Sequence, residues 1–205
     1  MIDIKLSDRA VDKVRALLAS ADPDVAGADA PGRGLRIGVT PGGCAGYSYS
    51  LALAAQADPD DLVLTQDGFE VFVHRAMSPL LRGIRIDYVE SIASSGFTFD
   101  NPNAGDACGC GTSFAATASA EQAVEEEAAD LALRRRVEAA LDDVRPYLRS
   151  EGGDVDVVSV ASGTVTLQLT GACGSCSMST VTLRGVIEKR LFEAVPGVRR
   201  VVAQG

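Results

Sequence analysis

The first apolar pattern along the chain has helical spacing. Apolar positions recur every three or four residues between Asp8 and Ser20, which predicts a helix there with Ser7 as its N-cap. From Leu35 the pattern changes to short extended runs bounded by Gly, Pro or Asp, which predict β-strands. These runs are "LRIGVT", "YSYSLALAA", "LVLTQ", "FEVFVH" and "IRIDYVES". The first half of the chain is therefore expected to be rich in β-structure.

A different pattern follows in the middle of the chain. Residues 115–130 are rich in Ala, Glu and Ser and poor in large apolar residues, which is typical of a solvated, partly helical linker. Residues 131–153 then have the spacing of a helix that ends at the pair Gly152-Gly153. We therefore expect the linker to separate two domains.

The last segment predicts a small α-β-β-α-β domain. "DVDVVSVASGTVTLQLTG" alternates as a β-hairpin with its turn near Ser162-Gly163. Residues 179–195 predict a second helix that stops before Pro196, and "VRRVVAQ" predicts a last short strand. This order favours helices on one face of a small sheet, in a domain of residues 131–205. Together with a β-rich domain of residues 1–114, the expected fold class is α+β.

Charge and hydropathy exclude some partners. The 205 residues carry a formal net charge of -9, divided as -6 over residues 1–114 and -3 over residues 115–205. Nucleic acid is therefore not expected as a partner, because it is bound through clustered basic residues. No apolar run approaches the length that crosses a bilayer, so no membrane partner is expected. The N-terminal sequence lacks the features of a secretory or transit peptide, and we expect a cytoplasmic protein.

Two of the five cysteines form a CxxC pair in the second half. Cys173 and Cys176 stand in "TGACGSCSMST", where a predicted strand gives way to a predicted helix. Two intervening residues let both sulfurs point the same way, and a helix N-terminus favours the thiolate. Such a pair can bind iron, bind zinc or form a disulfide. Two thiolates do not complete a tetrahedral metal site or the four ligands of a typical iron-sulfur cluster.

The other three cysteines form an incomplete set in the first half. Cys44 stands in "TPGGCAGYSY", and Cys108 and Cys110 stand in "GDACGCGTSF", which predicts a loop. The neighbouring glycines let the backbone approach a bound group closely. A symmetric homodimer would supply four thiolates from the CxxC pairs and up to six from the three-cysteine sets. A site completed by dimerisation is also easily opened, which suits a protein that holds a cluster temporarily.

Two tyrosines beside Cys44 and the single histidine are further candidates for a functional role. Tyr47 and Tyr49 lie at strand spacing beside Cys44, and we expect them to be packing residues. His74 is the single histidine, and we expect a partly exposed structural residue in a strand. None of the three is predicted to take part in the chemistry.

Both halves resemble known iron-sulfur proteins. "GGCAGYSY", followed by "SGFTFDNPNAGDACGCGTSF", resembles the A-type iron-sulfur carrier family, the HesB/IscA/SufA/ErpA group, over roughly residues 1–114. "YLRSEGGDVDVVSV" and "LTGACGSCSMSTVTLRGVIEKRL" resemble the NifU C-terminal (Nfu) domain over roughly residues 131–205. In this order the two motifs are similar to NfuA-type fusion carriers. Some of those have lost the cysteines of the A-type domain, whereas here all three are present.

The resemblance implies a function as an iron-sulfur cluster carrier rather than an enzyme. It implies that Cys173 and Cys176 bind a 4Fe-4S cluster shared between the subunits of a homodimer. The A-type domain would dock targets, bind a second cluster, 2Fe-2S or 4Fe-4S, at Cys44, Cys108 and Cys110, or do both. The implied partners are scaffold proteins that donate clusters and apo iron-sulfur enzymes that receive them.

Two other functions compete with this hypothesis. A thiol-disulfide oxidoreductase would also place a CxxC at a helix N-terminus after a strand. Against it, the chain has no Trp, Pro196 follows the CxxC helix in a turn, and three cysteines would stay unexplained. A zinc-stabilised interaction module is the second alternative, although the cysteines do not form two spaced pairs within one small unit.

Overall fold

The computed structural model describes residues 2–20, 34–42, 45–91, 95–107, 111–150, 152–171 and 177–204, with the backbone alone for 106–107 and 177–184. The chain divides into two compact units, Met1–Glu125 and Glu126–Gly205. The division falls inside the range 115–130 that the sequence predicts as a linker.

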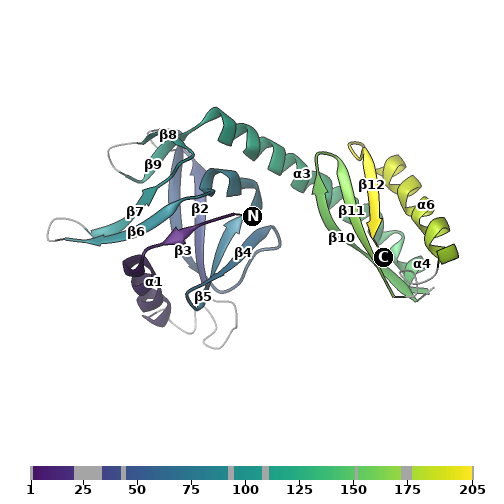
Figure 1. Cartoon of the computed structure of the whole chain (residues 1–205), viewed down its shortest axis with the longest axis horizontal. Helices are drawn as coiled ribbons and strands as arrows, with labels where there is room; N and C mark the ends of the chain where they lie inside the picture. The colour runs from purple at the N-terminus through teal and green to yellow at the C-terminus, as the bar shows by residue number, and fades with distance from the viewer. Residues whose placement is uncertain are drawn as a thin grey trace. The chain divides into compact units, whose positions relative to one another are not determined.

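Unit 1 is built on two β-sheets (Figure 1). One sheet has six strands in the order β4-β5-β2-β3-β9-β8, and the other has three in the order β1-β6-β7. The strands are β1 Lys5–Leu6, β2 Gly34–Pro41, β3 Tyr47–Ala54, β4 Asp61–Gln66, β5 Phe69–His74, β6 Arg85–Glu90, β7 Ser95–Asp100, β8 Ala104–Ala107 and β9 Ser113–Ala116. The helix α1 Asp8–Ser20 and the 3-10 helix η1 Arg75–Leu81 belong to the same unit.

The start of α1 follows from a side-chain cap. The Ser7 hydroxyl accepts a hydrogen bond from the backbone N–H of Ala10 at 3.2 Å, which satisfies one of the free donors of the first turn. Val11 and Val14 are buried on the apolar side of the helix. The predicted helix and its N-cap are confirmed.

The central strands of unit 1 follow the alternation of their apolar residues. Leu35, Ile37 and Val39 of β2 are buried in the core of this unit, and β2 pairs antiparallel with β3 and parallel with β5. The five extended runs of the sequence correspond to β2, β3, β4, β5 and β6. The expectation of a β-rich first half is confirmed.

Several elements of unit 1 were not predicted from the sequence. They are β1, η1, β7, β8 and β9. The prediction of a loop around Cys108 and Cys110 is wrong in its extent, because β8 ends at Ala107 and β9 begins at Ser113. These strands have four residues each, and β8 reads "AGDA", so local propensity is weak and pairing with neighbouring strands decides their conformation.

Unit 2 has two strand directions in one sheet (Figure 1). The strands β10 Gly153–Ala161, β11 Thr164–Gly171 and β12 Arg200–Gln204 have the order β10-β11-β12. β10 pairs antiparallel with β11, and β11 pairs parallel with β12. The helices are α3 Ala118–Asp142, which begins before the division between the units, α4 Arg145–Ser150 and α6 Ser177–Ala194.

The helix predicted over residues 131–153 starts too late and lacks a break, whereas its predicted end at the glycine pair agrees with the end of α4 at Ser150. α3 already begins at Ala118, since Ala and Glu are strong helix formers even where large apolar residues are scarce. It ends at Asp142, and α4 restarts at Arg145. Pro146 explains the break, because its ring has no N–H to donate to the Asp142 carbonyl and would clash with it in a continuous helix.

The hairpin and the core of unit 2 agree with the predictions. The turn between β10 and β11 has positive φ angles of 48° at Ser162 and 78° at Gly163, as a two-residue hairpin turn with right-handed twist requires. One core joins inward residues of the sheet, such as Val155 and Leu167, to residues of α3, α4 and α6. The helices therefore pack on one face of the sheet, and the α+β class is confirmed.

Candidate functional site

All five cysteines lie outside the described residues, but the chain on both sides of each set is described. Cys44 stands between β2 and β3, and Cys108 and Cys110 stand between β8 and β9. Cys173 and Cys176 stand between β11 and α6, which confirms the predicted strand-to-helix placement.

Two described glycines that flank Cys44, Gly42 and Gly46, are joined by a hydrogen bond. The N–H of Gly42 donates a hydrogen bond to the carbonyl of Gly46 at 2.7 Å. Their φ angles are 126° and 115°, which L-residues with side chains rarely adopt. The two glycines therefore fix the path of the backbone on both sides of this cysteine.

The chain around Cys108 and Cys110 is joined to the strand that follows Cys44. Tyr47 of β3 is paired with Phe114 of β9, and the N–H of Tyr49 donates to the carbonyl of Thr112 at 3.0 Å. On its other side, Phe114 is paired with Ala107 of β8. β3 and β9 are antiparallel. The residues that precede Tyr47 and the residues that precede Ser113 therefore extend from the paired strands in opposite directions.

An aromatic stack supports this part of unit 1. The Tyr49 ring lies between Phe99, with centroids 4.2 Å apart, and Phe114, with centroids 4.5 Å apart. Tyr47 also stacks on Phe114 at 5.7 Å. Burial raises the pKa of the Tyr49 phenol above its ordinary value, against the effect of a hydrogen bond with Asn101. The expectation that both tyrosines are packing residues is confirmed.

The start of the CxxC segment depends on a close contact between backbones. Gly171 ends β11 with a φ of 70°, and a Cβ added to it would lie 2.4 Å from the carbonyl oxygen of Gly152. Gly152 follows α4 and also has a positive φ, of 78°. The glycine pair that the sequence assigned to a helix end therefore also packs against the last residue of β11.

A fixed acidic side chain lies at the same edge of unit 2. Asp154 follows Gly153, which is paired with Gly171. Hydrogen bonds from the N–H of Val155 and from Arg149, at 3.0 Å, lower the pKa of the Asp154 carboxyl, as does the charge of Arg145. The carboxylate is thus held by neighbours within unit 2.

Histidine and carboxylate side chains can also bind metal ions. Among the described residues, no group of three or more His, Cys, Asp or Glu side chains is placed to hold a metal ion. His74 is the exposed last residue of β5, as expected of a structural residue. The sequence analysis did not predict the hydrogen bonds of the Asn101 and Asn103 side chains to the carbonyls of Leu80 and Arg82, although the letters "NPN" are typical of a turn.

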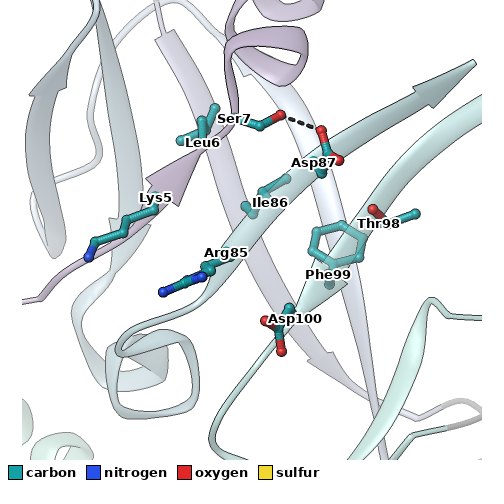
Figure 2. A pocket seen from close by; sticks show the side chains of 9 residues that line it. All are labelled: Lys5, Leu6, Ser7, Arg85, Ile86, Asp87, Thr98, Phe99 and Asp100. Carbon is teal, nitrogen blue, oxygen red and sulfur yellow. Dashed lines mark hydrogen bonds between the residues drawn. The ribbon is translucent and has the colours of Figure 1, made fainter.

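An open groove of about 540 Å³ lies along the three-stranded sheet of unit 1 (Figure 2). It is lined partly by charged and polar side chains, namely Lys5, Ser7, Arg85, Asp87, Thr98 and Asp100. The Ser7 hydroxyl donates a hydrogen bond to the Asp87 carboxylate, so Asp87 orients the cap of α1 (Figure 2). The groove includes none of the residues next to the cysteines.

Comparison with known proteins assigns both parts of the chain to families. The model of the iron-sulphur cluster biosynthesis family matches residues 2–112. The chain belongs to this family. The model of the NifU-like domain matches residues 137–202. Each matched range contains one of the two cysteine sets, so the resemblance to both families is confirmed.

Individual relatives agree with the family assignment. The protein HesB, heterocyst, of Trichormus variabilis is 44% identical over 113 residues, which are 55% of this chain and 89% of that protein. An uncharacterised protein in the nifU 5' region of Azotobacter vinelandii is 43% identical over 112 residues, 55% of this chain and 98% of that protein. A crystal structure of IscA with the 2Fe-2S cluster has a TM-score of 0.50 at 34% identity and covers 56% of this chain and 99% of its own.

These relatives place the chain among proteins of iron-sulfur cluster assembly, with a HesB/IscA-like part followed by a NifU-like part. No helix in the described part of the chain is long and apolar enough to cross a membrane.

Proposed function

We propose that this protein binds labile iron-sulfur clusters at its two cysteine sets and transfers them to apo-proteins. The observation that carries the proposal is the coincidence of each family match with one set. Cys44, Cys108 and Cys110 fall in the first matched range, and Cys173 and Cys176 fall in the second.

The donor set suits an iron-sulfur cluster as cargo. Thiolates are the usual ligands of such clusters, and neither set alone has the four that a typical cluster needs. We propose that Cys173 and Cys176 of two subunits bind one 4Fe-4S cluster across a two-fold axis. The position of Cys176 directly before α6 supports the thiolate form, because a helix N-terminus stabilises negative charge.

The N-terminal set would bind a second cluster, 2Fe-2S or 4Fe-4S. From the β3–β9 pair the chain runs in one direction toward Cys44 and in the opposite direction toward Cys110. This divergence supports a cluster whose ligands are shared between two subunits. The positive φ angles of the glycines at 42 and 46 let the backbone turn closely on both sides of the cysteine, which supports a close approach to a bound cluster. The same unit would also dock the recipient.

Transfer would proceed by ligand exchange. A thiolate of the recipient replaces one cysteine thiolate at an iron atom, and the released cysteine takes up a proton from water. Repetition moves the cluster without net oxidation or reduction and without breaking a bond of a substrate, so the protein is proposed to be a carrier rather than an enzyme. A scaffold protein would supply the cluster, and the expected location is the cytoplasm.

Cluster transfer tests the proposal directly. Protein reconstituted without oxygen is mixed with the apo-form of a 4Fe-4S enzyme, and the recovered activity of that enzyme is measured with and without an iron chelator. We expect the enzyme to regain activity faster than it does with free iron and sulfide, and to regain it in the presence of the chelator. Recovery no faster than with free iron and sulfide would contradict the carrier function.

The same preparations separate the carrier from its alternatives. A thiol-disulfide oxidoreductase would reduce insulin with Cys173 and Cys176 in metal-free protein, and the carrier is expected not to do so. A zinc-stabilised module would lose its fold when metal is removed. The carrier is expected to keep both cores without metal, because each unit has its own buried apolar cluster.

A further inference from the structure

The strand that leads into Cys108 is weakly held by its sheet. β8 is an edge strand, and among the described strands it pairs with β9 alone. Its register also shifts between Ala104 and Ala107. An edge strand with an irregular register has few ladder hydrogen bonds, so other contacts must fix its position.

The side-chain amide of Asn101 provides such contacts. Its Nδ2 donates to the carbonyl of Leu80 and to the hydroxyl of Tyr49, both at 2.8 Å. Its Oδ1 accepts from the backbone N–H of Asn103 at 2.9 Å. A backbone N–H can only donate, so the amide oxygen must face Asn103 and the nitrogen must face the two acceptors. The orientation of Asn101 is therefore determined by its partners.

The turn of residues 101–103 also holds the base of the β8–β9 hairpin. The N–H of Ala104 donates to the Asn101 carbonyl at 3.1 Å, and the N–H of Thr117 donates to the Asn103 carbonyl at 3.0 Å. The Asn103 side chain donates to the Arg82 carbonyl at 2.7 Å. The first residue of β8 and the residue after β9 are thus fastened to the end of η1.

Tyr49 connects this turn to the other side of the hairpin. Its hydroxyl accepts from Asn101, while its own N–H donates to the Thr112 carbonyl at 3.0 Å. Its ring packs on Phe114 of β9. Tyr49 therefore contacts both the turn before β8 and Thr112, two positions after Cys110.

We propose that Asn101 and Tyr49 are positioning residues for Cys108 and Cys110, acting through the two strands of the hairpin. Their hydrogen bond keeps the hairpin on the sheet and so sets how readily the two thiols are reached by a reagent or a recipient. The consequence for cluster release rests on the proposed function. The effect on the thiols themselves does not need a cluster.

Thiol alkylation of the metal-free, reduced, full-length protein tests this inference. Tyr49→Phe removes one oxygen and keeps the stacked ring, and Asn101→Asp keeps the size but replaces both donors by an oxygen. Tyr47→Phe is the matched control, because its ring also stacks on Phe114 and its hydroxyl has no hydrogen bond among the described residues. Iodoacetamide labelling is followed at each cysteine by mass spectrometry.

We expect alkylation of Cys108 and Cys110 to become about three- to tenfold faster in Tyr49→Phe, as for the loss of one hydrogen bond. Rates at Cys44, Cys173 and Cys176 should not change, and Tyr47→Phe should match the wild type. Asn101→Asp should accelerate alkylation of these two cysteines more than Tyr49→Phe does. Should Asn101→Asp fail to fold, the result for Tyr49→Phe decides alone.

Two results would overturn the inference. The first is a Tyr49→Phe protein that reacts like Tyr47→Phe at Cys108 and Cys110. The second is an equal acceleration at Cys44, which would mean that the network merely supports unit 1 as a whole. Because no metal is present, either result would leave cluster binding to be judged by the transfer experiment.

Discussion

Gly171 occupies a position where no side chain fits. Its φ is positive, and the Gly152 carbonyl oxygen would lie 2.4 Å from an added Cβ. Neither neighbour can move easily, since Gly152 has a positive φ and Gly153 is paired with Gly171 in the sheet. Gly171, two positions before Cys173, is therefore fixed by backbone contacts rather than by side-chain packing.

Substitution of this glycine should destabilise unit 2. We expect Gly171→Ala to lower its free energy of unfolding by about 2–4 kcal/mol, from backbone strain and the clash. Gly185→Ala is the control, because an added Cβ in the middle of α6 meets no atom of the described residues within 4 Å. It should raise the stability by about 0.5–1 kcal/mol. Hydrogen exchange of unit 2 measures both, and equal stabilities of the two variants would contradict the close contact.

Asp87 links the stability of unit 1 to pH. The hydrogen bond from the Ser7 hydroxyl is the main cause that lowers the pKa of this carboxyl below its ordinary value of 3.8, and Tyr88 and Arg9 act in the same direction. A carboxyl with a lowered folded-state pKa stabilises the fold above its unfolded-state pKa. That contribution is lost as the pH falls from about 4 through the folded-state pKa.

The expected result is a difference between variants that depends on pH. Asp87→Asn should destabilise unit 1 at pH 7 relative to the wild type, and the difference should shrink as the pH falls below 4. Asp12→Asn is the control, since Asp12 is exposed on α1 without a hydrogen bond or ion pair among the described residues. Thermal unfolding from pH 2.5 to 7 measures the effect. A difference that stays constant over this range would refute the linkage.

At the scale of elements, α3 and the β10–β11 hairpin are tied by one carboxylate. Both oxygens of Asp130 accept from the N–H of Ser162, at 2.9 and 3.1 Å. Ser162 has a positive φ, which is uncommon for a residue with a side chain. The helix thus caps a turn that the hairpin alone would hold less firmly.

Removal of this cap should loosen the turn. We expect Asp130→Ala to lower the stability of unit 2 by about 1 kcal/mol. Glu127→Ala removes an acid three positions earlier on the same helix that has no partner among the described residues, and it should be near neutral. Urea unfolding followed by circular dichroism compares them. Equal effects of the two substitutions would show that helix propensity, not the cap, is responsible.

Elements with a strong pattern could be predicted from the sequence, and those held by distant contacts could not. α1 begins and ends as expected because Ser7 caps it and its apolar side is continuous. β8 has no such pattern, since the edge strand "AGDA" depends on β9 and on Asn101 for its place. The break at Pro146 was predictable in principle from proline chemistry, but the helical periodicity on both sides concealed it.

For the whole molecule, the sequence was most informative about chemistry. Two cysteine motifs in order predict both family matches, because thiol spacing reports ligand geometry directly. The contacts that position those motifs were not predictable. Gly152 and Gly171 meet across a sheet, and Tyr49 and Asn101 are 52 residues apart in the chain.

The incomplete cysteine sets predict an oligomeric change. Loading with a cluster should convert the protein to a dimer, because one subunit offers only two or three thiolates at each site. Sedimentation velocity without oxygen measures this for loaded and metal-free protein. Iron removal by a chelator should reverse the change if dimerisation depends on the cluster. A loaded monomer would contradict the shared site.

Iron and acid-labile sulfide content, measured with the visible spectrum, shows whether the protein binds iron-sulfur clusters. The samples are protein purified without oxygen as wild type, as the Cys173→Ser/Cys176→Ser variant, and as the Cys44→Ser/Cys108→Ser/Cys110→Ser variant. We predict a brown wild type with matched iron and sulfide, and reduced but residual colour in each variant. A wild type that is colourless, free of sulfide and resistant to anaerobic reconstitution would contradict cluster binding.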